Sequence, residues 1–357
     1  MAIVIRLLKK NETELANDFF NAVYKINRPI KNFNWEFVEC PWGSAVYVIA
    51  VDESITAYTK VVGIQCGIPI ELISAKGDIL LTAKSEDTLV DPAYRGQKIF
   101  ERMYDLLFEE CKRAGIKFIW GFTPAKKAFE RIGFQVPFMA HQALMVFNPV
   151  ASYNYLSRLN PQNRTIDKVK IAGLTFLSLL TSFKALVTPS SKALSAKQLN
   201  ISSKKEIIQK LTPGSPLYFL NMDEKYLEWR IGRNPFHNDY ENHQFFHGDT
   251  LIADVIVNFR KAGIGYLEQI IFSDEASWDL KKGVIVHIVQ RMKKKVNIIR
   301  VLCFDINETL GSQEALLKQC GFLILNRGAH FVWKSLGSDD IKPDGLFLSR
   351  LFTQGNQ

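Results

Sequence analysis

The sequence predicts an α/β protein that contains two copies of one fold. Residues 85–134 read as an apolar strand, a turn carrying Arg95-Gly96-Gln97-Lys98, an amphipathic helix, a second strand and a second short helix. A Gly-Phe pair ends a short helix twice, at Gly133-Phe134 and at Gly321-Phe322. The chain length of 357 residues also favours two domains, since one domain takes roughly 150 residues.

The first copy is expected to be a mixed, mostly antiparallel sheet flanked by helices. Asn11-Glu12-Thr13-Glu14 resembles a capping box, which predicts a helix to about residue 27, and an aromatic loop follows at residues 33–42. Apolar runs rich in β-branched and aromatic residues predict the strands. These runs cover residues 3–7, 45–51, 61–69, 78–90, 118–122 and 139–147, and the main helix covers residues 98–113.

The second copy is predicted to be degenerate. Its strand at residues 300–304 matches the one at 118–122, and its helix at 279–295 matches the one at 98–113. Where the first copy reads Val90-DPAYRGQK, the second reads Ile271-FSDEASWD, which has no Arg-Gly pair and no proline turn. The expected domains are residues 1–150, a helical connector at 151–200 with an exposed loop from residue 188 to 205, a second domain at 201–340 and a C-terminal tail at 341–357.

The composition narrows the class of protein. Five dispersed cysteines without a C-x-x-C pair are typical of reduced thiols, so we expect a cytoplasmic protein without a metal site. Residues 171–187 are the most apolar stretch, but polar residues and Lys184 interrupt it, so a buried connecting helix is expected rather than membrane insertion. The net charge of +9 is spread along the chain, which does not indicate nucleic-acid binding and suits anionic small molecules equally well.

The turn at Arg95–Lys98 is the first candidate for chemistry. A strand that passes through a glycine turn into a helix directs several backbone N–H groups at one point, where they can bind a phosphate. The second copy lacks this turn, so any anion is expected to bind to the first copy.

At this point the sequence resembles the GNAT superfamily of CoA-dependent N-acyltransferases in a tandem arrangement. The resemblance rests on Thr88-Leu89-Val90, on Arg95-Gly96-Gln97-Lys98-Ile99-Phe100 and on Phe129-Glu130-Arg131-Ile132-Gly133-Phe134. It implies an acyl-CoA co-substrate, with an acetyl or a longer or hydroxylated acyl group, whose pyrophosphate is held by the backbone of residues 95–100. The backbone of Leu89 and Val90 is implied to bind the pantetheine arm and polarise the thioester carbonyl. The implied CoA-binding residues are Leu89, Val90, Arg95, Gly96, Gln97, Lys98, Ile99, Phe100, Thr123 and Lys126.

Three positions depart from the family pattern. Lys98 and Phe100 stand where the family pattern has small residues, and Phe129 stands where many members have a tyrosine acid. The candidate catalytic residues are Glu86, Asp87 and His141, which could equally be turn-capping carboxylates and a core histidine.

Among GNAT proteins, the tandem layout resembles bacterial N-acyltransferases that act on dTDP-linked 3-amino-3,6-dideoxyhexoses for surface polysaccharides such as lipopolysaccharide or capsule. The resemblance implies direct attack of a sugar amine on the thioester. The candidate acceptor-binding residues are Thr88, Trp229, Arg230, Asn234 and His237. Two alternatives stay open: transfer to a protein or peptide amine, and a non-catalytic acyl-CoA-binding protein. The sequence does not determine the oligomeric state.

Overall fold

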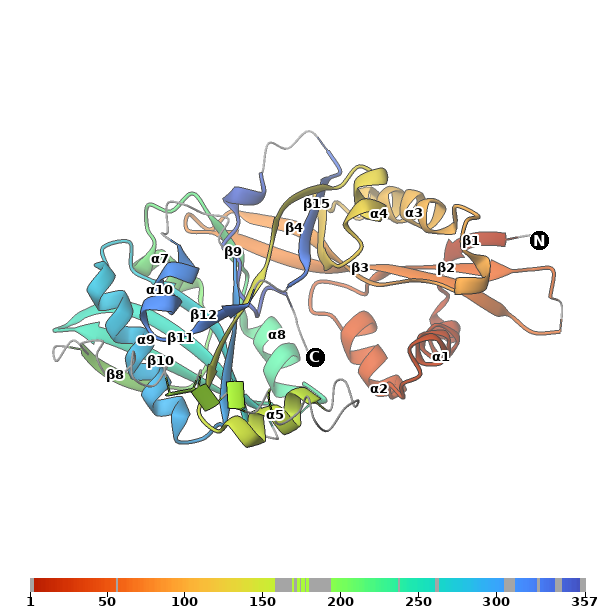
Figure 1. Ribbon diagram of the computed structural model, residues 1–357. Coiled ribbons are helices and arrows are strands. Elements are labelled where there is room, and N and C mark those ends of the chain that lie inside the picture. Colours follow the sequence, from red (N-terminus) through yellow and green to blue (C-terminus); the bar gives the residue numbers. More distant parts are fainter. Residues whose placement is uncertain are drawn as a thin grey trace. The chain divides into compact units, whose positions relative to one another are not determined.

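Residues 3–55, 57–157, 169, 172–173, 175–176, 178–179, 194–236, 238–260, 263–304, 312–325, 328–337 and 342–353 are described by a computed structural model. Their contacts divide into two compact units. Unit 1 comprises Met1–Pro137, Leu220–Phe236 and His330–Pro343, and unit 2 comprises Phe138–Phe219, His237–Ala329 and Asp344–Gln357. Each unit contains one mixed sheet with helices against it (Figure 1).

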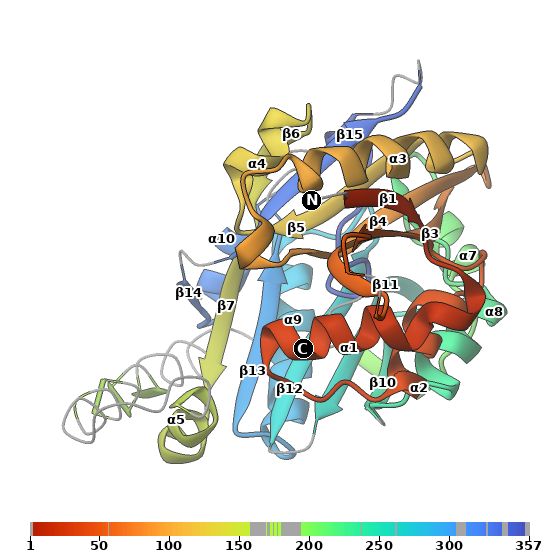
Figure 2. The same cartoon turned by 90° about the vertical axis from the view of Figure 1, so that its right-hand side faces the viewer.

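The sheet of unit 1 has the strand order β1-β2-β3-β4-β5-β15-β6. Its strands are β1 (Ile3–Leu7), β2 (Val46–Asp52), β3 (Lys60–Ser74), β4 (Ile79–Val90), β5 (Phe118–Thr123), β6 (Gln135–Met139) and β15 (His330–Ser335). Helices α3 and α4 cover one face, whereas α1 and α2 lie on the other (Figures 1 and 2). The helices are α1 (Thr13–Tyr24), α2 (Ile30–Phe33), α3 (Ile99–Arg113), α4 (Lys126–Arg131) and α8 (Glu224–Leu227), with shorter turns η1 (Lys10–Glu12), η2 (Asn34–Val38), η3 (Pro92–Tyr94) and η4 (Glu228–Gly232).

The sheet of unit 2 has the order β14-β7-β13-β12-β11-β10-β8. Its strands are β7 (His141–Val146), β8 (Leu194–Leu199), β10 (Asp239–His247), β11 (Thr250–Arg260), β12 (Ile264–Phe272), β13 (Ile298–Cys303) and β14 (Leu323–Leu325). The remaining elements are α5 (Pro149–Ser157), α7 (Lys205–Leu211), β9 (Tyr218–Leu220), α9 (Trp278–Lys293), α10 (Gln313–Gln319) and η6 (Pro343–Gly345).

The helix α3 fixes the position of the strand–turn–helix segment. Its buried residues Ile99, Met103, Leu107 and Cys111 recur every four positions, which is the spacing of one face of a helix. They pack on buried side chains of β2, β3, β4 and β5 in one core. Burial of each such side chain contributes about 1.5–3 kcal/mol, so the start of α3 is firmly held against the end of β4.

The two copies exchange their last strands. The strand β7 follows the first copy in sequence but pairs antiparallel with β13 and β14. The strand β15 follows the second copy but pairs antiparallel with β5, from His330↔Thr123 to Ser335↔Phe118. The units are therefore not the continuous ranges 1–150 and 201–340 that the sequence predicts, because strands of similar pattern can complete either sheet.

Two sequence predictions of irregular structure were wrong. Part of the expected aromatic loop at 33–42 is helical, because Phe33, Trp35 and Phe37 are all buried when the chain coils through α2 and η2. Part of the expected exposed loop at 188–205 is the strand β8, which pairs with β10 and turns Leu194 and Ala196 toward the core.

The remaining predictions concern the connecting helix, membrane insertion and the cysteines. Most of the expected connecting helix at 171–187 lies outside the described residues. Among the residues that the structure describes, no helix is long and apolar enough to cross a membrane. All five cysteines are free and buried.

Candidate functional site

The turn between β4 and α3 has an unusual backbone. Gly96 has φ +82° and Lys98, the residue before α3, has φ +56° in the left-handed region. Only glycine adopts this region without cost, so Lys98 stores about 1–2 kcal/mol of strain. The turn keeps the conformation of a glycine at residue 98 although the side chain is a lysine.

This backbone leaves a row of donors open. No hydrogen-bond acceptor is found among the described residues for the backbone N–H groups of residues 96–101, and the first helical bond is donated by Arg102 to the carbonyl of Lys98. A side chain added at Gly96 would meet no atom within 4 Å, so the face of the turn is open. Open N–H groups at the start of a 15-residue helix form an anion site.

Beside this turn, β4 and β5 separate. They pair in parallel only at Ala83↔Ile119 and Lys84↔Trp120, although β4 runs on to Val90. Leu89 and Val90 pair with β3 on their other side. Because successive residues of an antiparallel ladder turn their N–H groups to opposite sides, one of these two residues directs its N–H toward the opened side.

A bulge marks the middle of the opened part of β4. Register pairs run from Ile64↔Leu89 to Cys66↔Glu86, so that Asp87 and Thr88 together oppose Gln65. Asp87 has φ +49°, which is rare for a residue with a side chain.

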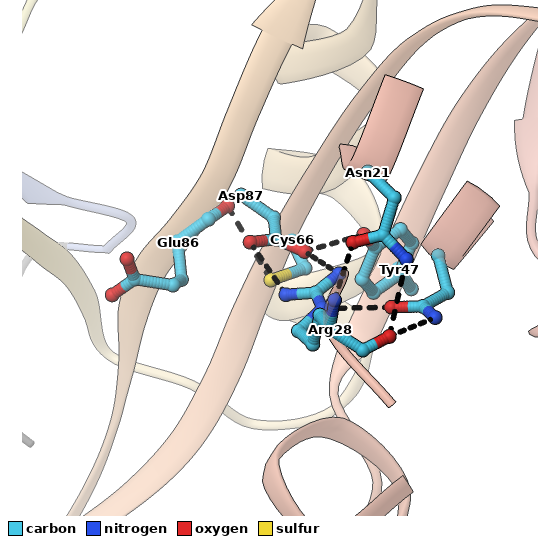
Figure 3. Close-up of polar contacts among 7 residues, drawn as sticks. Asn21, Arg28, Tyr47, Cys66, Glu86 and Asp87 are labelled. Atoms are coloured by element: carbon cyan, nitrogen blue, oxygen red, sulfur yellow. Dashed lines mark hydrogen bonds and ion pairs between the residues drawn. The ribbon is translucent and has the colours of Figure 1, made fainter. Parts of the chain in front are cut away.

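The carboxylate of Asp87 is held by a buried ion pair (Figure 3). Arg28 Nη1 and Nη2 donate to its two oxygens at 3.2 and 2.9 Å, and Tyr47 donates its hydroxyl at 2.9 Å. Burial raises the pKa of Asp87, while Arg28 and Tyr47 oppose this rise. Because both oxygens accept hydrogen bonds, Asp87 is placed to fix the bulge rather than to receive a proton from a substrate.

Glu86 points away from this cluster in Figure 3 and forms an ion pair with Lys84. The structure brings a third carboxylate, Glu36 of η2, into the electrostatic field of Glu86 and Lys84. Glu36 is half-buried, and its carboxylate forms no hydrogen bond or ion pair with the side chain of any described residue. Burial, with repulsion by Glu86, raises the pKa of Glu36 to about 7, which suits a general base near neutral pH.

The sequence alone did not identify Glu36. A second internal repeat, around residues 34–37 and 228–231, could have revealed its segment. Asn34-Trp35-Glu36-Phe37 matches Glu228-Trp229-Arg230-Ile231, and both segments form the same pair of short helical turns. Trp35 and Trp229 stack at 4.9 Å between ring centroids, and each indole N–H donates to the other residue's carbonyl. This packing holds η2, and Glu36 within it, in place.

The expected acceptor-binding residues of this segment are not on a surface. Trp229, Arg230 and Asn234 are 0%, 1% and 4% exposed. Asn234 donates to the carbonyl of Arg230 and accepts from the N–H of Phe236. The ring of Trp229 packs on Trp35, and the role of these residues in acceptor binding stays a prediction. His237 lies outside the described residues.

A hydroxyl network lies at the start of the opened part. Tyr104 of α3 is fully buried, and its hydroxyl lies 2.7 Å from Ser85 Oγ and 3.2 Å from Thr88 Oγ1. Thr88 is partly exposed, so it connects this network with the surface. Phe129, at the expected place of a tyrosine acid, is buried against Phe100 and Tyr104.

The other predicted residues divide between the two units. Thr123 ends β5 and accepts the N–H of Ala125 through its hydroxyl, and Lys126 is exposed at the start of α4. Arg95 and Gln97 are exposed on the turn, whereas Ile99 is buried. His141 lies on β7 in unit 2, where Nδ1 contacts Glu314.

Comparisons with known proteins agree with this geometry. The family model for the acetyltransferase (GNAT) domain matches residues 4–136. A search of curated protein sequences finds no match.

Solved structures are similar over almost the whole chain. A probable N-acyltransferase from Enterococcus faecalis V583 has a TM-score of 0.59 at 8% identity, covering 94% of this chain and 73% of that chain. A tandem GNAT protein from the clavulanic acid biosynthesis pathway has a TM-score of 0.52 at 12% identity, covering 95% and 100%. The glucosamine N-acetyltransferase region of a fungal multi-domain β-N-acetylglucosaminidase has a TM-score of 0.58 at 10% identity, covering 93% and 38%.

The prediction of an α/β fold with two tandem GNAT-like domains is confirmed by the two mixed sheets and by the tandem GNAT structure. The domain match over residues 4–136 supports the expectation of an acyl-CoA-dependent N-acyltransferase.

Proposed function

We propose that unit 1 binds acyl-CoA at the β4–α3 turn and transfers the acyl group to the amine of a nucleotide-linked amino sugar. The row of open N–H groups at residues 96–101, directly after the separated end of β4, carries this proposal. These donors fit the CoA pyrophosphate, and Arg95 and Lys98 add positive charge beside them.

The opened side of β4 would receive the rest of the co-substrate. The pantetheine arm lies along Leu89 and Val90, where one backbone N–H is directed to the opened side. A thioester carbonyl that accepts from this N–H becomes more electrophilic and its tetrahedral intermediate is stabilised. The fixed bulge at Asp87 keeps this donor in position.

Glu36 is proposed as the general base. The neutral amine attacks the thioester carbon, the C–N bond forms, the C–S bond breaks and CoA leaves as a thiolate. Glu36 takes the proton from the nitrogen, because its pKa of about 7 leaves it ionised at slightly alkaline pH. The Thr88 hydroxyl, which is backed by Tyr104, is proposed to donate a hydrogen bond to the thiolate, which takes its proton from solvent.

The proposed acceptor is the amine of a sugar linked to a nucleotide. The similarity to a glucosamine N-acetyltransferase region supports an amino sugar, and the net charge of +9 suits an anionic sugar nucleotide. We propose a dTDP-linked 3-amino-3,6-dideoxyhexose, used in the cytoplasm for surface polysaccharide synthesis. A peptide amine is the alternative acceptor.

Thiol release with a chromogenic disulfide reagent tests the proposal. Acetyl-CoA and longer acyl-CoA are each combined with dTDP- and UDP-linked amino sugars, glucosamine and short peptides. We expect release with a sugar-linked amine, and its loss in Glu36→Gln at unchanged acetyl-CoA affinity. Release only with peptides would contradict the sugar acceptor, and CoA binding without release from any acceptor would contradict catalysis.

A further inference from the structure

The chain after α5 turns apolar side chains to solvent in unit 2. The residues described between positions 169 and 179 are all helical, and Val169, Phe176 and Leu179 among them are 72%, 63% and 66% exposed. These three residues form the apolar patch. The sequence predicts a buried connecting helix at 171–187, and this is wrong for its described residues, of which only Ser178 is buried.

One contact sets the orientation of this helical stretch. The Ser178 hydroxyl donates to the carbonyl of Val146, the last residue of β7, at 2.9 Å. Because successive helical residues are rotated by about 100°, Ser178 lies on the side opposite Val169 and Phe176. The stretch therefore turns a polar side chain toward the sheet and the apolar patch toward solvent, which is the reverse of an ordinary surface helix.

The end of α9 places cations at the same point of the fold. Lys293 Nζ lies 5.8 Å from the ring centroid of Phe147, the residue that follows Val146. Helix α5 begins two residues later, at the end of β7 (Figure 2). Lys293 and Lys294 are exposed and form no ion pair with any residue that the structure describes. In the sequence, residues 149–187 add five basic residues and only one acidic residue, Asp167.

Apolar side chains beside cations select one kind of partner. A second copy of this chain could cover the apolar patch, but the contact would bring like charges together. A nucleic acid would balance the cations but would leave Phe176 and Leu179 in water. The surface of an anionic lipid bilayer satisfies both, since its acyl region takes up apolar side chains and its phosphates attract lysines.

We propose that unit 2 binds the surface of an anionic lipid bilayer. The apolar patch enters the boundary between headgroups and acyl chains, and Lys293 and Lys294 lie against the lipid phosphates. The inference does not rest on the proposed acyl transfer, because the β4–α3 turn belongs to unit 1.

Co-sedimentation of the full chain with lipid vesicles tests the proposal. Vesicles of phosphatidylcholine are compared with vesicles that also contain phosphatidylglycerol, at low and at high salt. A DNA duplex serves as a polyanion without an apolar interior. We expect at least about tenfold tighter binding to the phosphatidylglycerol vesicles than to either of the others, and weaker binding at high salt.

Two variants separate the apolar and the charged contributions. Phe176→Ser should weaken binding to phosphatidylglycerol vesicles about tenfold at either salt concentration, because one aromatic side chain no longer enters the bilayer. Lys293→Gln with Lys294→Gln should weaken binding about thirtyfold at low salt and much less at high salt, since salt screens the lost attraction.

Matched controls change the same residue types elsewhere. Ile79→Ser removes an apolar side chain of unit 1 that is 53% exposed. Lys205→Gln with Lys210→Gln removes two exposed lysines of α7. Both controls should keep the vesicle affinity of the unsubstituted chain. All these side chains are exposed, so the Tm should stay the same in every variant.

Four outcomes would overturn the proposal. They are equal binding to both kinds of vesicle, unchanged vesicle binding in Phe176→Ser, and binding to the DNA duplex as tight as to phosphatidylglycerol vesicles. The fourth is a dimer in light scattering that Phe176→Ser dissociates, which would show that a second copy covers the apolar patch.

Discussion

The two strand–turn–helix segments, β4–α3 and β12–α9, share one arrangement of elements but differ at the start of the helix. In the first, left-handed residues at Gly96 and Lys98 leave the N–H groups before and within the first helical turn open. In the second, no residue from 273 to 277 has a positive φ, and Ser277 caps the helix with its own hydroxyl. An anion site at a helix start therefore depends on turn conformation and capping, and not on the fold alone.

The bulges of β4 and β12 each contain an acidic residue held in an ion pair. Asp87 on β4 and Glu268 on β12 lie at equivalent register shifts, and each is paired with an arginine. Arg28 comes from the segment between α1 and α2, whereas Arg350 comes from the C-terminal segment, which also donates the N–H of Arg350 to the carbonyl of Glu268. The C-terminal segment thus binds the bulge of β12 through both a side chain and the backbone.

The largest effect is expected from breaking these ion pairs. Arg28→Ala and Arg350→Ala should each lower the free energy of unfolding by about 3–5 kcal/mol, because a carboxylate stays buried without its partner. Urea denaturation measures this change.

The same two substitutions should differ in their effect on acyl transfer. Arg28→Ala should also lower kcat/KM for acyl transfer through the bulge of β4, whereas folded Arg350→Ala should not. Arg233→Ala, which removes an exposed ion pair with Glu39, should cost less than about 1 kcal/mol. An equal loss of kcat/KM in Arg350→Ala would contradict the assignment of catalysis to unit 1.

The next largest effect is a loss of activity on substitution of Glu36. Arg230 occupies the matching position in the repeated segment at residues 228–231. Glu36→Gln should lower kcat about a hundredfold, the usual contribution of a general base, and should remove the rise of kcat/KM through about pH 7. Stopped assays across the pH range measure this, with exposed Glu39→Gln as the control. An unchanged pH profile would argue for water as the base.

The same substitution has a pH-dependent effect on stability. The folded pKa of Glu36 is raised to about 7 from the ordinary 4.5, so the unfolded chain ionises first and stability falls as the pH rises between these values. Glu36→Gln removes this loss. It should match the unsubstituted protein below pH 4.5 and be more stable above pH 7. The reverse order would show that burial does not raise this pKa.

A smaller effect is expected at the turn. Gly96→Val forces a β-branched residue to φ +82°, which should displace the open N–H groups and weaken acetyl-CoA binding at least about tenfold. Gly248→Val places the same strain in the β10–β11 hairpin, at φ +59°, and should not change acetyl-CoA affinity. Equal affinities in both variants would remove the turn from the site.

The smallest effect is expected at the closed turn. Ser277→Ala removes the helix cap and should lower the free energy of unfolding by about 1 kcal/mol. It should not create a second CoA site, because the turn before α9 lacks the left-handed residues. A gain of CoA binding would mean that the cap alone closes this turn.

Local patterns predicted the central segment well. The strand 3–7, the strand ending at Val90 and the helix from about residue 98 to Arg113 match β1, β4 and α3, because apolar spacing and turn residues are short-range signals. The open N–H groups also follow from the local turn sequence.

Non-local contacts explain what the sequence did not predict. Asp87 is tied by Arg28, 59 residues away, so its role in fixing the bulge depends on tertiary packing. The raised pKa of Glu36 depends on its burial and on Glu86. The exchange of β7 and β15 depends on which sheet edge each strand meets, which strand pattern does not specify.

Calorimetric titration of the full chain with acetyl-CoA tests the central difference between the two copies most directly. The open turn of β4–α3 and the capped turn of β12–α9 predict one site per chain, weakened in Gly96→Val and retained in Ser277→Ala. Two sites per chain, or one site unaffected by Gly96→Val, would contradict the account.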